Sequence, residues 1–175
     1  MRLVRLVEAL HELSLFDARL PRLRIEDVEM GPLVRRLVDL RRPEFVTRRI
    51  TLHTNVSVGR VRADPDLLSQ AVSNLVDNAL KYTPETGEVT VEVTNTDGAV
   101  RVAVTNTGEG IAPQDLPFIF ERFYRGEKSR SRESGGAGIG LSIVKEVAAV
   151  HGGQVGASSA DGRATVWLSL PAPPR

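Results

Sequence analysis

The chain has 175 residues, 41% of them hydrophobic, which is enough for one main domain with its own core. Its 23 Lys and Arg residues nearly balance 22 Asp and Glu, so a net charge of +1 excludes a global field that would favour nucleic acid or an acidic membrane. The absence of cysteine and the presence of only three scattered histidines exclude a disulfide framework, thiolate metal sites and a histidine metal cluster.

The first element predicted from the sequence is an amphipathic helix at residues 3–16. Its apolar side chains recur at steps of three and four residues and form a narrow stripe that needs a packing partner. They are Leu3, Leu6, Val7, Leu10 and Leu13. Residues 17–30 contain Pro21 and mixed charges, which indicates a linker with one short strand at residues 23–25.

A second helix is predicted to begin at Pro32, because the first helical turn tolerates proline, and to end at Pro43. Its apolar positions are Leu33, Val34, Leu37, Val38 and Leu40. Two short strands are then predicted at residues 50–54 and 58–62, where β-favouring residues alternate with polar ones.

A third helix is predicted from Asp64-Pro65 to about Lys81. Aspartate can accept the free N–H groups of the first turn, and proline loses no needed donor there. The apolar row of this helix comprises Leu67, Ala71, Leu75 and Ala79, and the adjacent row comprises Asn74, Asn78 and Lys81. Asparagine is unfavourable inside helices, so two of them on this face need an explanation. Asn74 and Asn78 could supply oxygen ligands to a cation such as Mg²⁺, or they could cap neighbouring strands or loops. Capping is the commoner role.

The second half of the chain predicts two β-hairpins and a fourth helix. The strands are expected at residues 88–95, 99–105, 154–157 and 164–170. The helix is expected at residues 138–150, with Gly152-Gly153 ending it. Apart from the N-terminal amphipathic helix, about three helices and five or six mostly antiparallel strands predict an α+β fold with its helices on one face of a sheet. Residues 108–136 form a connection too long to be a simple turn.

Two glycine-rich segments are candidate ligand-binding turns. In residues 106–111 the glycines permit close approach to a ligand and Asn106 could read a base edge, although such a segment is more often only a turn. Residues 135–141 open a helix whose N–H groups could cradle a phosphate. No hydrophobic strand precedes these glycines and no Gly-Lys-Ser/Thr follows them, which excludes a Rossmann unit and a P-loop. A charged lid with a glycine hinge and a disordered basic loop are the two remaining interpretations.

Residues 118–125 contain three of the five phenylalanines, which predicts a packed anchor between the two glycine segments. Arg122 and Arg125 are candidate phosphate contacts, because guanidinium groups match phosphate oxygens. An ion pair with Glu121 or Asp115 explains Arg122 equally well.

The order and spacing of these segments resemble the ATP-binding domain of bacterial sensor histidine kinases, a branch of the superfamily that also contains gyrase, Hsp90 and MutL. The resemblance covers roughly residues 64–171. Residues 74–83 look like the N box, 106–111 like the first glycine box, 118–125 like the F box and 136–141 like the second glycine box. The resemblance implies a Bergerat-type two-layer α/β sandwich with a mixed, mostly antiparallel sheet.

The resemblance also implies ATP and Mg²⁺ as ligands. Asn78 would bind the metal, Asn74 would lie beside it, and Lys81 would contact a phosphate or the ribose, so these three are the expected catalytic residues. Tyr82 would stack near the adenine. The remaining expected nucleotide-binding residues are Asn106, Gly108, Gly110, Ile111, Arg125, Gly136, Gly138, Ile139, Gly140 and Leu141. His151 would be structural.

Asn106 departs from the family, which usually has an aspartate that accepts a hydrogen bond from the adenine amino group. An amide oxygen can still accept this bond, but without charge, at a cost of about 1 kcal/mol or several-fold in affinity. Weakened binding and a degenerate regulatory module without catalysis are therefore both expected alternatives. A protein-serine kinase of the anti-sigma type and an ATPase clamp are rivals that the long F box disfavours.

The resemblance further divides the chain into residues 1–20 as a partial dimerisation and histidine-phosphotransfer helix, 21–30 as a linker and 31–175 as the catalytic ATP-binding domain. His11-Glu12 resembles the phosphoacceptor dipeptide but lies close to the linker, so His11 is interpreted as a surface or packing residue. The phosphoacceptor histidine is expected outside this chain.

The implied reaction transfers the γ-phosphoryl group of Mg-ATP to that histidine and thence to an aspartate of a response regulator. The expected partners are the receiver domain and the phosphotransfer helices of an intact, homodimeric kinase. No nucleic acid and no direct membrane contact are expected. Because no apolar run approaches the roughly 20 residues that span a bilayer, we expect a soluble cytoplasmic chain, or the cytoplasmic part of a membrane-bound sensor.

Overall fold

The computed structural model describes residue 14 and residues 23–96, 98–126 and 138–173. The elements are β1 (Glu26–Glu29), α2 (Met30–Thr47), β2 (Thr51–Val56), β3 (Arg60–Ala63), α3 (Pro65–Tyr82), β4 (Glu88–Thr96), β5 (Ala99–Thr107), α5 (Gly140–Val150), β6 (Gln154–Ala160) and β7 (Arg163–Pro171). The helix predicted at residues 3–16 and the residue His11 lie outside the described part, except for Ser14. No helix within the described ranges has both the length and the apolar character needed to cross a bilayer.

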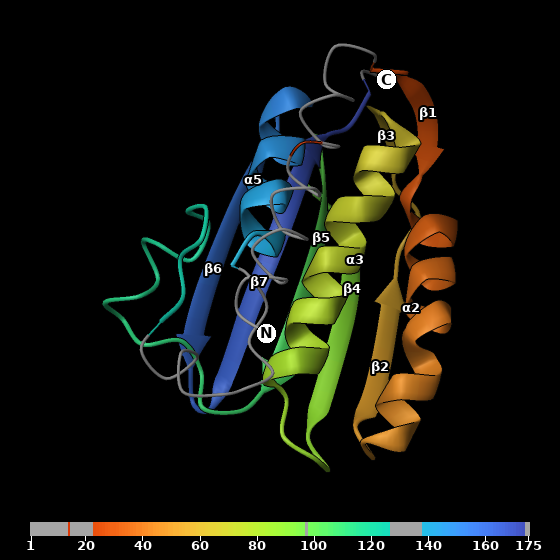
Figure 1. Ribbon diagram of the computed structural model, residues 1–175. Helices are drawn as coiled ribbons and strands as arrows, with labels where there is room; N and C mark the ends of the chain where they lie inside the picture. The colour runs from red at the N-terminus through yellow and green to blue at the C-terminus, as the bar shows by residue number, and fades with distance from the viewer. Residues whose placement is uncertain (1–13, 15–22, 97, 127–137, 174–175) are drawn as a thin grey trace.

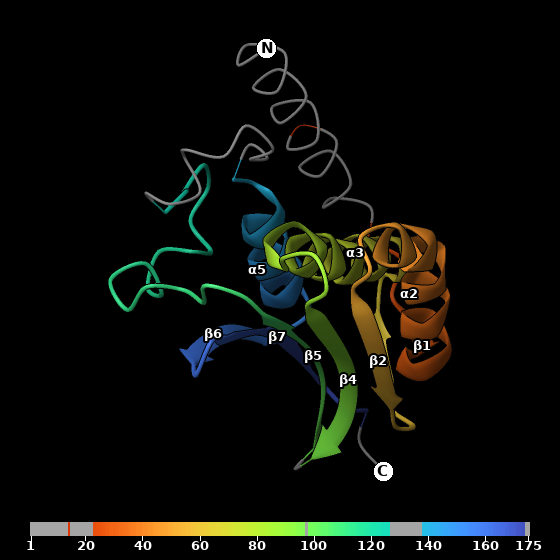
Figure 2. The ribbon, with the colours of Figure 1, turned by 90° about the horizontal axis from the view of Figure 1, so that it is seen from below.

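The described residues form two layers, a sheet and a layer of helices. The five-stranded sheet has the order β2-β4-β5-β7-β6, in which only β2 and β4 are parallel, and β1 pairs with β3 in a separate antiparallel ribbon. Helices α2, α3 and α5 lie on one face of the sheet, and no helix of the described chain covers the other face (Figures 1 and 2). The α+β sandwich predicted from the sequence is confirmed.

The core lies between the sheet and the helices and follows from the alternation of side chains along each strand. Val91, Val104 and Val166 occupy paired positions on β4, β5 and β7 and are almost completely buried. The apolar row predicted for α3 packs against this face, since all four of its residues are at most 2% exposed. The same alternation turns Asn106, two residues after Val104, toward the helices at the end of β5.

Two boundaries predicted around the second helix are wrong. Helix α2 runs from Met30 through Pro43 to Thr47, because Phe45 is 1% exposed in the core and its burial outweighs the one backbone hydrogen bond that proline cannot donate. The short strand expected at residues 23–25 forms instead as β1, where Val28 pairs with the buried Val61 of β3. In both cases tertiary packing overrides the local signal.

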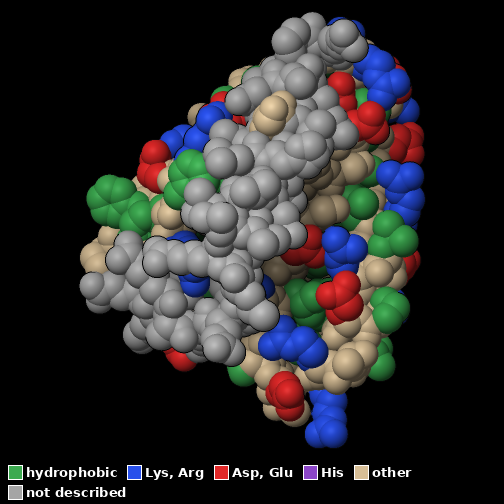
Figure 3. All heavy atoms as spheres, viewed as in Figure 1, with side chains coloured by type: hydrophobic (Ala, Val, Ile, Leu, Met, Phe, Trp, Pro, Cys, Tyr) green, Lys and Arg blue, Asp and Glu red, His purple; other side chains and the backbone are tan. Residues whose placement is uncertain are grey.

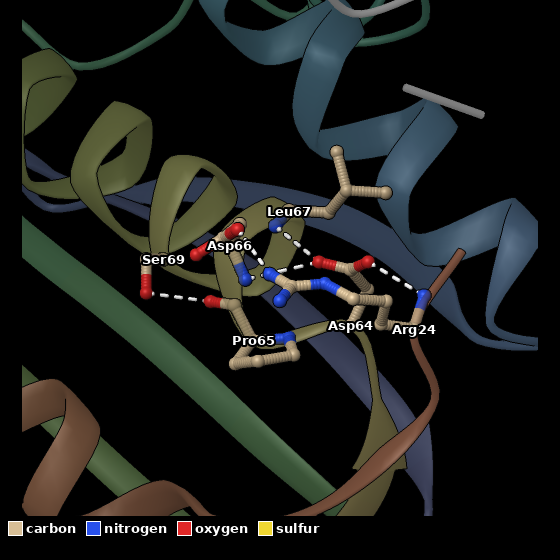
Figure 4. A network of polar contacts seen from close by, with 6 residues as sticks. All are labelled: Arg24, Asp64, Pro65, Asp66, Leu67 and Ser69. Atoms are coloured by element: carbon tan, nitrogen blue, oxygen red, sulfur yellow. Dashed lines mark hydrogen bonds and ion pairs between the residues drawn. The ribbon is translucent and has the colours of Figure 1, made fainter. Parts of the chain in front are cut away.

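Asp64, just before α3, is 6% exposed and joins separate parts of the chain. Figure 4 shows its contacts with Arg24 and with the first turn of α3. One carboxylate oxygen caps the helix by accepting from the backbone N–H groups of Asp66 and Leu67 at 3.0 and 3.1 Å. The other accepts from the backbone N–H of Arg24 at 2.9 Å, and the Asp64 N–H donates to Nε2 of His151 at the same distance. His151 therefore ties the end of α5 to the start of α3, in agreement with its expected structural role.

We expect Asp64→Ala to lower the free energy of unfolding by about 2 kcal/mol at neutral pH, because three backbone donors lose their acceptor. Burial alone raises the pKa of Asp64, but the hydrogen bonds from Arg24, Leu67 and Asp66 and the charge of Arg24 lower it below its ordinary value overall. A carboxyl with a lowered folded-state pKa stabilises fully above its unfolded pKa of about 4, and this stabilisation is lost as the pH falls through the folded-state value.

Urea unfolding of the variant and the wild type at several pH values tests this expectation. The difference between them should be greatest at neutral pH and should shrink in acid. Asp39→Ala, which removes only an exposed carboxylate paired with Arg42 within α2, is the matched control and should cost less than about 0.5 kcal/mol. A difference for Asp64→Ala that does not change with pH would contradict the argument.

Candidate nucleotide-binding site

A cavity of about 520 Å³ opens between α3, the end of β5, residues 109–126 and the start of α5. Its volume lies in the range of pockets that bind small organic ligands. The predicted residues that line it are Asn74, Asn78, Lys81, Tyr82, Asn106, Gly110, Ile111, Arg125, Gly138, Ile139, Gly140 and Leu141. The described parts of all four sequence segments thus converge on one cavity. Of the other two expected residues, Gly136 lies outside the described part, and Gly108 does not line the cavity.

Helix α3 contributes the polar wall of the cavity. The Nδ2 atom of Asn74 is buried and has no hydrogen-bond partner among the described residues. A buried donor without an acceptor is costly in a folded protein unless a ligand or water satisfies it. Gly140 packs against this side chain, since a Cβ placed on it would lie 3.6 Å from Oδ1 of Asn74. The start of α5 and the middle of α3 therefore meet at a donor that suits a phosphate oxygen.

Asn106 lies at the floor of the cavity and is 5% exposed. Its Nδ2 donates to the carbonyl oxygen of Thr107 at 3.1 Å, which leaves Oδ1 as the acceptor available to a ligand. The flipped amide would set two oxygens against each other, so Thr107 favours the observed orientation. A hydrogen-bond acceptor at this position suits an amino group, such as the adenine amino group that Asn106 is predicted to bind.

Gly108, which was expected to shape the adenine pocket, does not itself line the cavity. Its N–H donates to the carbonyl oxygen of Gly162 at 2.9 Å, and a Cβ at this position would lie 2.9 Å from the carbonyl oxygen of Tyr82. Gly108 shapes the site only by allowing the end of α3 to approach the end of β5.

Two glycines in the cavity wall permit close approaches that another residue would block. Gly110 has a φ of 72°, and a Cβ there would lie 2.5 Å from Oγ of Ser159, which also accepts from the Ile111 N–H at 2.8 Å. Gly138 has a φ of 78°, and its carbonyl oxygen accepts from the Phe123 N–H at 3.0 Å. This contact holds residues 118–125 against the start of α5.

Two predictions for residues 118–125 are wrong. Phe118 and Phe123 are about half exposed, and only Phe120 packs against the core, so the three rings do not form one packed anchor. The segment consists of turns, which do not place every third side chain on a common face. Arg122 lies away from the cavity lining and pairs with Glu146 of α5 at 3.1 Å, whereas Glu121 pairs with Lys145.

Sequence reasoning missed three acidic residues in the cavity wall, Asp77, Glu109 and Asp115. The hydroxyl of Tyr124 donates to Oδ1 of Asp115 at 2.7 Å. Asp77 is held by a fork from Arg41 of α2, with Nε and Nη2 donating to its two carboxylate oxygens at 2.6 and 3.1 Å. The hydrogen bond and the charge of Asp77 raise the pKa of Arg41. The position of Asp77 between Asn74 and Asn78 was a signal for its place in the site, whereas nothing in the sequence pointed to Arg41.

The donor set tests whether this cavity fits a magnesium ion with its nucleotide. Within the described residues no group of three or more His, Cys, Asp or Glu residues could hold a metal by itself. Asn78 in the cavity wall offers an uncharged oxygen, and Mg²⁺ typically binds through few protein groups together with phosphate oxygens and water. The residues present therefore fit a metal that arrives with a triphosphate.

The comparison with known families agrees with this geometry. The family described as "Histidine kinase-, DNA gyrase B-, and HSP90-like ATPase" matches residues 63–174. The chain belongs to this ATPase family. The matched range contains all the described residues of the cavity.

Within the histidine kinase-like ATPases, the sensor-like histidine kinase SenX3 of Mycobacterium tuberculosis (strain ATCC 25618 / H37Rv) is 39% identical over 175 residues. This match covers 98% of the chain but 42% of SenX3, so the chain spans less than half the length of this curated relative. The mycobacterial sensor histidine kinase MprB has a solved structure that matches with a TM-score of 0.74 and 32% identity over 87% of this chain and 100% of that one. Full-length ShkA in complex with AMPPNP matches with a TM-score of 0.81 and 31% identity over 97% of this chain and 36% of ShkA.

Proposed function

We propose that this chain is the ATP-binding catalytic part of a two-component sensor histidine kinase. It binds Mg-ATP in the cavity between α3 and α5 and presents the γ-phosphoryl group to a histidine outside this chain. The observation that carries the proposal is the convergence of the amide-bearing face of α3 with both glycine turns on one cavity large enough for a nucleotide.

Each side chain has a role that its chemistry supports. Asn106 accepts from the adenine amino group, and Tyr82 lies beside the base. Asn74 donates its buried amide to a phosphate oxygen, Lys81 and Arg125 neutralise phosphate charge, and the N-terminus of α5 with Gly138 and Gly140 favours the anion.

Asn78 would hold Mg²⁺ through its amide oxygen. A magnesium ion held there would supply positive charge that offsets the negative charge of the phosphates.

In the phosphoryl transfer, the protein contributes mainly by positioning the reactants and by neutralising charge. A histidine ring nitrogen attacks the γ-phosphorus in line, the bond from phosphorus to the β,γ-bridging oxygen breaks, and ADP leaves. The phosphohistidine then passes its phosphoryl group to an aspartate of a response regulator.

We propose the corresponding division of the chain. Residues 1–20 would belong to the dimerisation and phosphotransfer helix, 21–30 to the linker and 31–175 to the catalytic domain of a homodimeric kinase that works in the cytoplasm. The contact of Arg24 with Asp64 supports a linker that docks on the start of α3.

Calorimetric titration of the chain with ATP, with and without Mg²⁺, tests the proposed function. We expect saturable heat that requires the metal. With radiolabelled ATP and a fragment that carries the phosphotransfer hairpin of the intact kinase, the label should appear on the fragment. A chain that shows no heat with Mg-ATP, or that binds it without labelling the hairpin, would contradict the proposal.

A further inference from the structure

The cavity wall includes the carboxylate of Asp77, which would ordinarily form an ion pair with Lys81 of the same helix. Asp77 and Lys81 lie four residues apart on α3, with the acid on the N-terminal side, which is the favourable spacing and order for a helical ion pair. Both residues line the cavity. A direct pair between them would occupy the Lys81 ammonium and lower the positive charge available to a phosphate.

The structure instead pairs Asp77 with Arg41, on the neighbouring helix α2. The fork at 2.6 and 3.1 Å occupies both carboxylate oxygens, whereas the second acid near Arg41, Glu44, is 3.9 Å away. A planar guanidinium that meets a carboxylate with two parallel hydrogen bonds is a stronger partner than a flexible ammonium.

Lys81 consequently makes no ion pair with any carboxylate of the described residues. Its Nζ lies 4.7 Å from the centroid of the Tyr82 ring, at the wall of the cavity. A cation held over a ring at such a site keeps its hydrogen-bond donors for another partner.

A second arginine near the end of α2, Arg48, also reaches α3, but it donates to the carbonyl oxygens of Leu80 and Thr83 and not to Asp77. Acidic and basic side chains are interspersed over the part of the surface that includes α2 (Figure 3). Arg42, the next residue, pairs with Asp39 on its own helix at 2.8 Å, and within the described residues no hydrogen bond or ion pair joins it to α3. The effect of Arg41 therefore depends on its specific contact with Asp77 rather than on a general basic patch.

We propose that Arg41 is a positioning residue of the nucleotide site, which sequesters Asp77 so that Lys81 remains available to a phosphate group of the ligand. Arg41 lies outside the cavity lining and acts only through Asp77. The inference rests on the proposed function, because it assumes that the ligand of Lys81 is a nucleotide phosphate.

The experiment measures the Kd values of Mg-ATP and of adenosine for the whole chain carrying Arg41→Met. The released Asp77 should pair with Lys81 and repel the triphosphate, so the Kd of Mg-ATP should rise about fivefold at low salt and less at high salt. The Kd of adenosine, which has no phosphate, should not change. Arg42→Met removes the same charge from the same helix and should leave both values as in the wild type.

The double variant Arg41→Met/Asp77→Asn separates sequestration from a structural role. Removing the charge of Asp77 should restore the affinity of Arg41→Met for Mg-ATP, because Lys81 then has no competing carboxylate. Equal effects of Arg41→Met and Arg42→Met, a parallel loss of adenosine binding, or a double variant as weak as Arg41→Met would each overturn the inference. A wild-type chain that does not bind Mg-ATP would instead refute the proposed function.

Discussion

Replacing Asn78 with alanine is expected to remove magnesium-dependent ATP binding without weakening the fold. The change deletes the amide oxygen proposed to hold the metal, and losing a ligand to a charged group costs roughly 2 to 3 kcal/mol, or about 30-fold to 150-fold in Kd. Alanine is also the better residue inside a helix, by about 0.5 kcal/mol, so the unfolding midpoint should stay level or rise. Calorimetry with Mg-ATP and thermal unfolding measure the two effects separately.

Two further variants control this expectation. Asn78→Asp retains an oxygen at the same place and should keep part of the magnesium dependence. Asn55→Ala removes an exposed amide from β2, outside the cavity, and should change nothing. If Asn78→Ala bound Mg-ATP as tightly as the wild type, the assignment of the metal to this side chain would be wrong.

Gly138→Ala is expected to weaken nucleotide binding at least tenfold. A Cβ at Gly138 would lie 2.7 Å from the carbonyl oxygen of Tyr124 and 2.9 Å from the carbonyl carbon of Phe123. Both are backbone atoms, so the methyl group must push residues 118–125 away from the start of α5 and open the cavity. Equilibrium titration with Mg-ATP measures the loss.

Gly98→Ala is the matched control for backbone strain. Gly98 has a φ of 77°, close to the 78° of Gly138, but nothing lies within 4 Å of a Cβ placed on it. Each alanine pays about 1 to 2 kcal/mol for a left-handed backbone, but only Gly138→Ala adds a collision. Equal ATP affinities for the two variants would show that the close approach at Gly138 does not support the site.

Much of the site could be predicted because its parts are local patterns. Asn74, Asn78 and Lys81 share one face through helical spacing alone, and Asp64-Pro65 marks the start of their helix. Strand β5, which contains Asn106, alternates between buried and more exposed side chains, and this alternation sets the side on which Asn106 lies. Such features depend on a few neighbouring residues, so they survive in whatever tertiary context the chain adopts.

Three of the errors arose where a distant contact outweighs a local signal. Burial of Phe45 carries α2 through Pro43, and pairing with β3 moves the first strand beyond residue 25. Arg122 pairs with Glu146, which lies 24 residues later in the sequence.

The sequence by itself determined the helices, most of the strands and the four segments that can meet a nucleotide, because periodicity, caps and glycine turns are properties of short stretches. Only the tertiary structure decided that the segments close around one cavity, and that Arg41 rather than Lys81 pairs with Asp77. The last outcome is a competition between partners, and which partner wins depends on distances that no local pattern encodes.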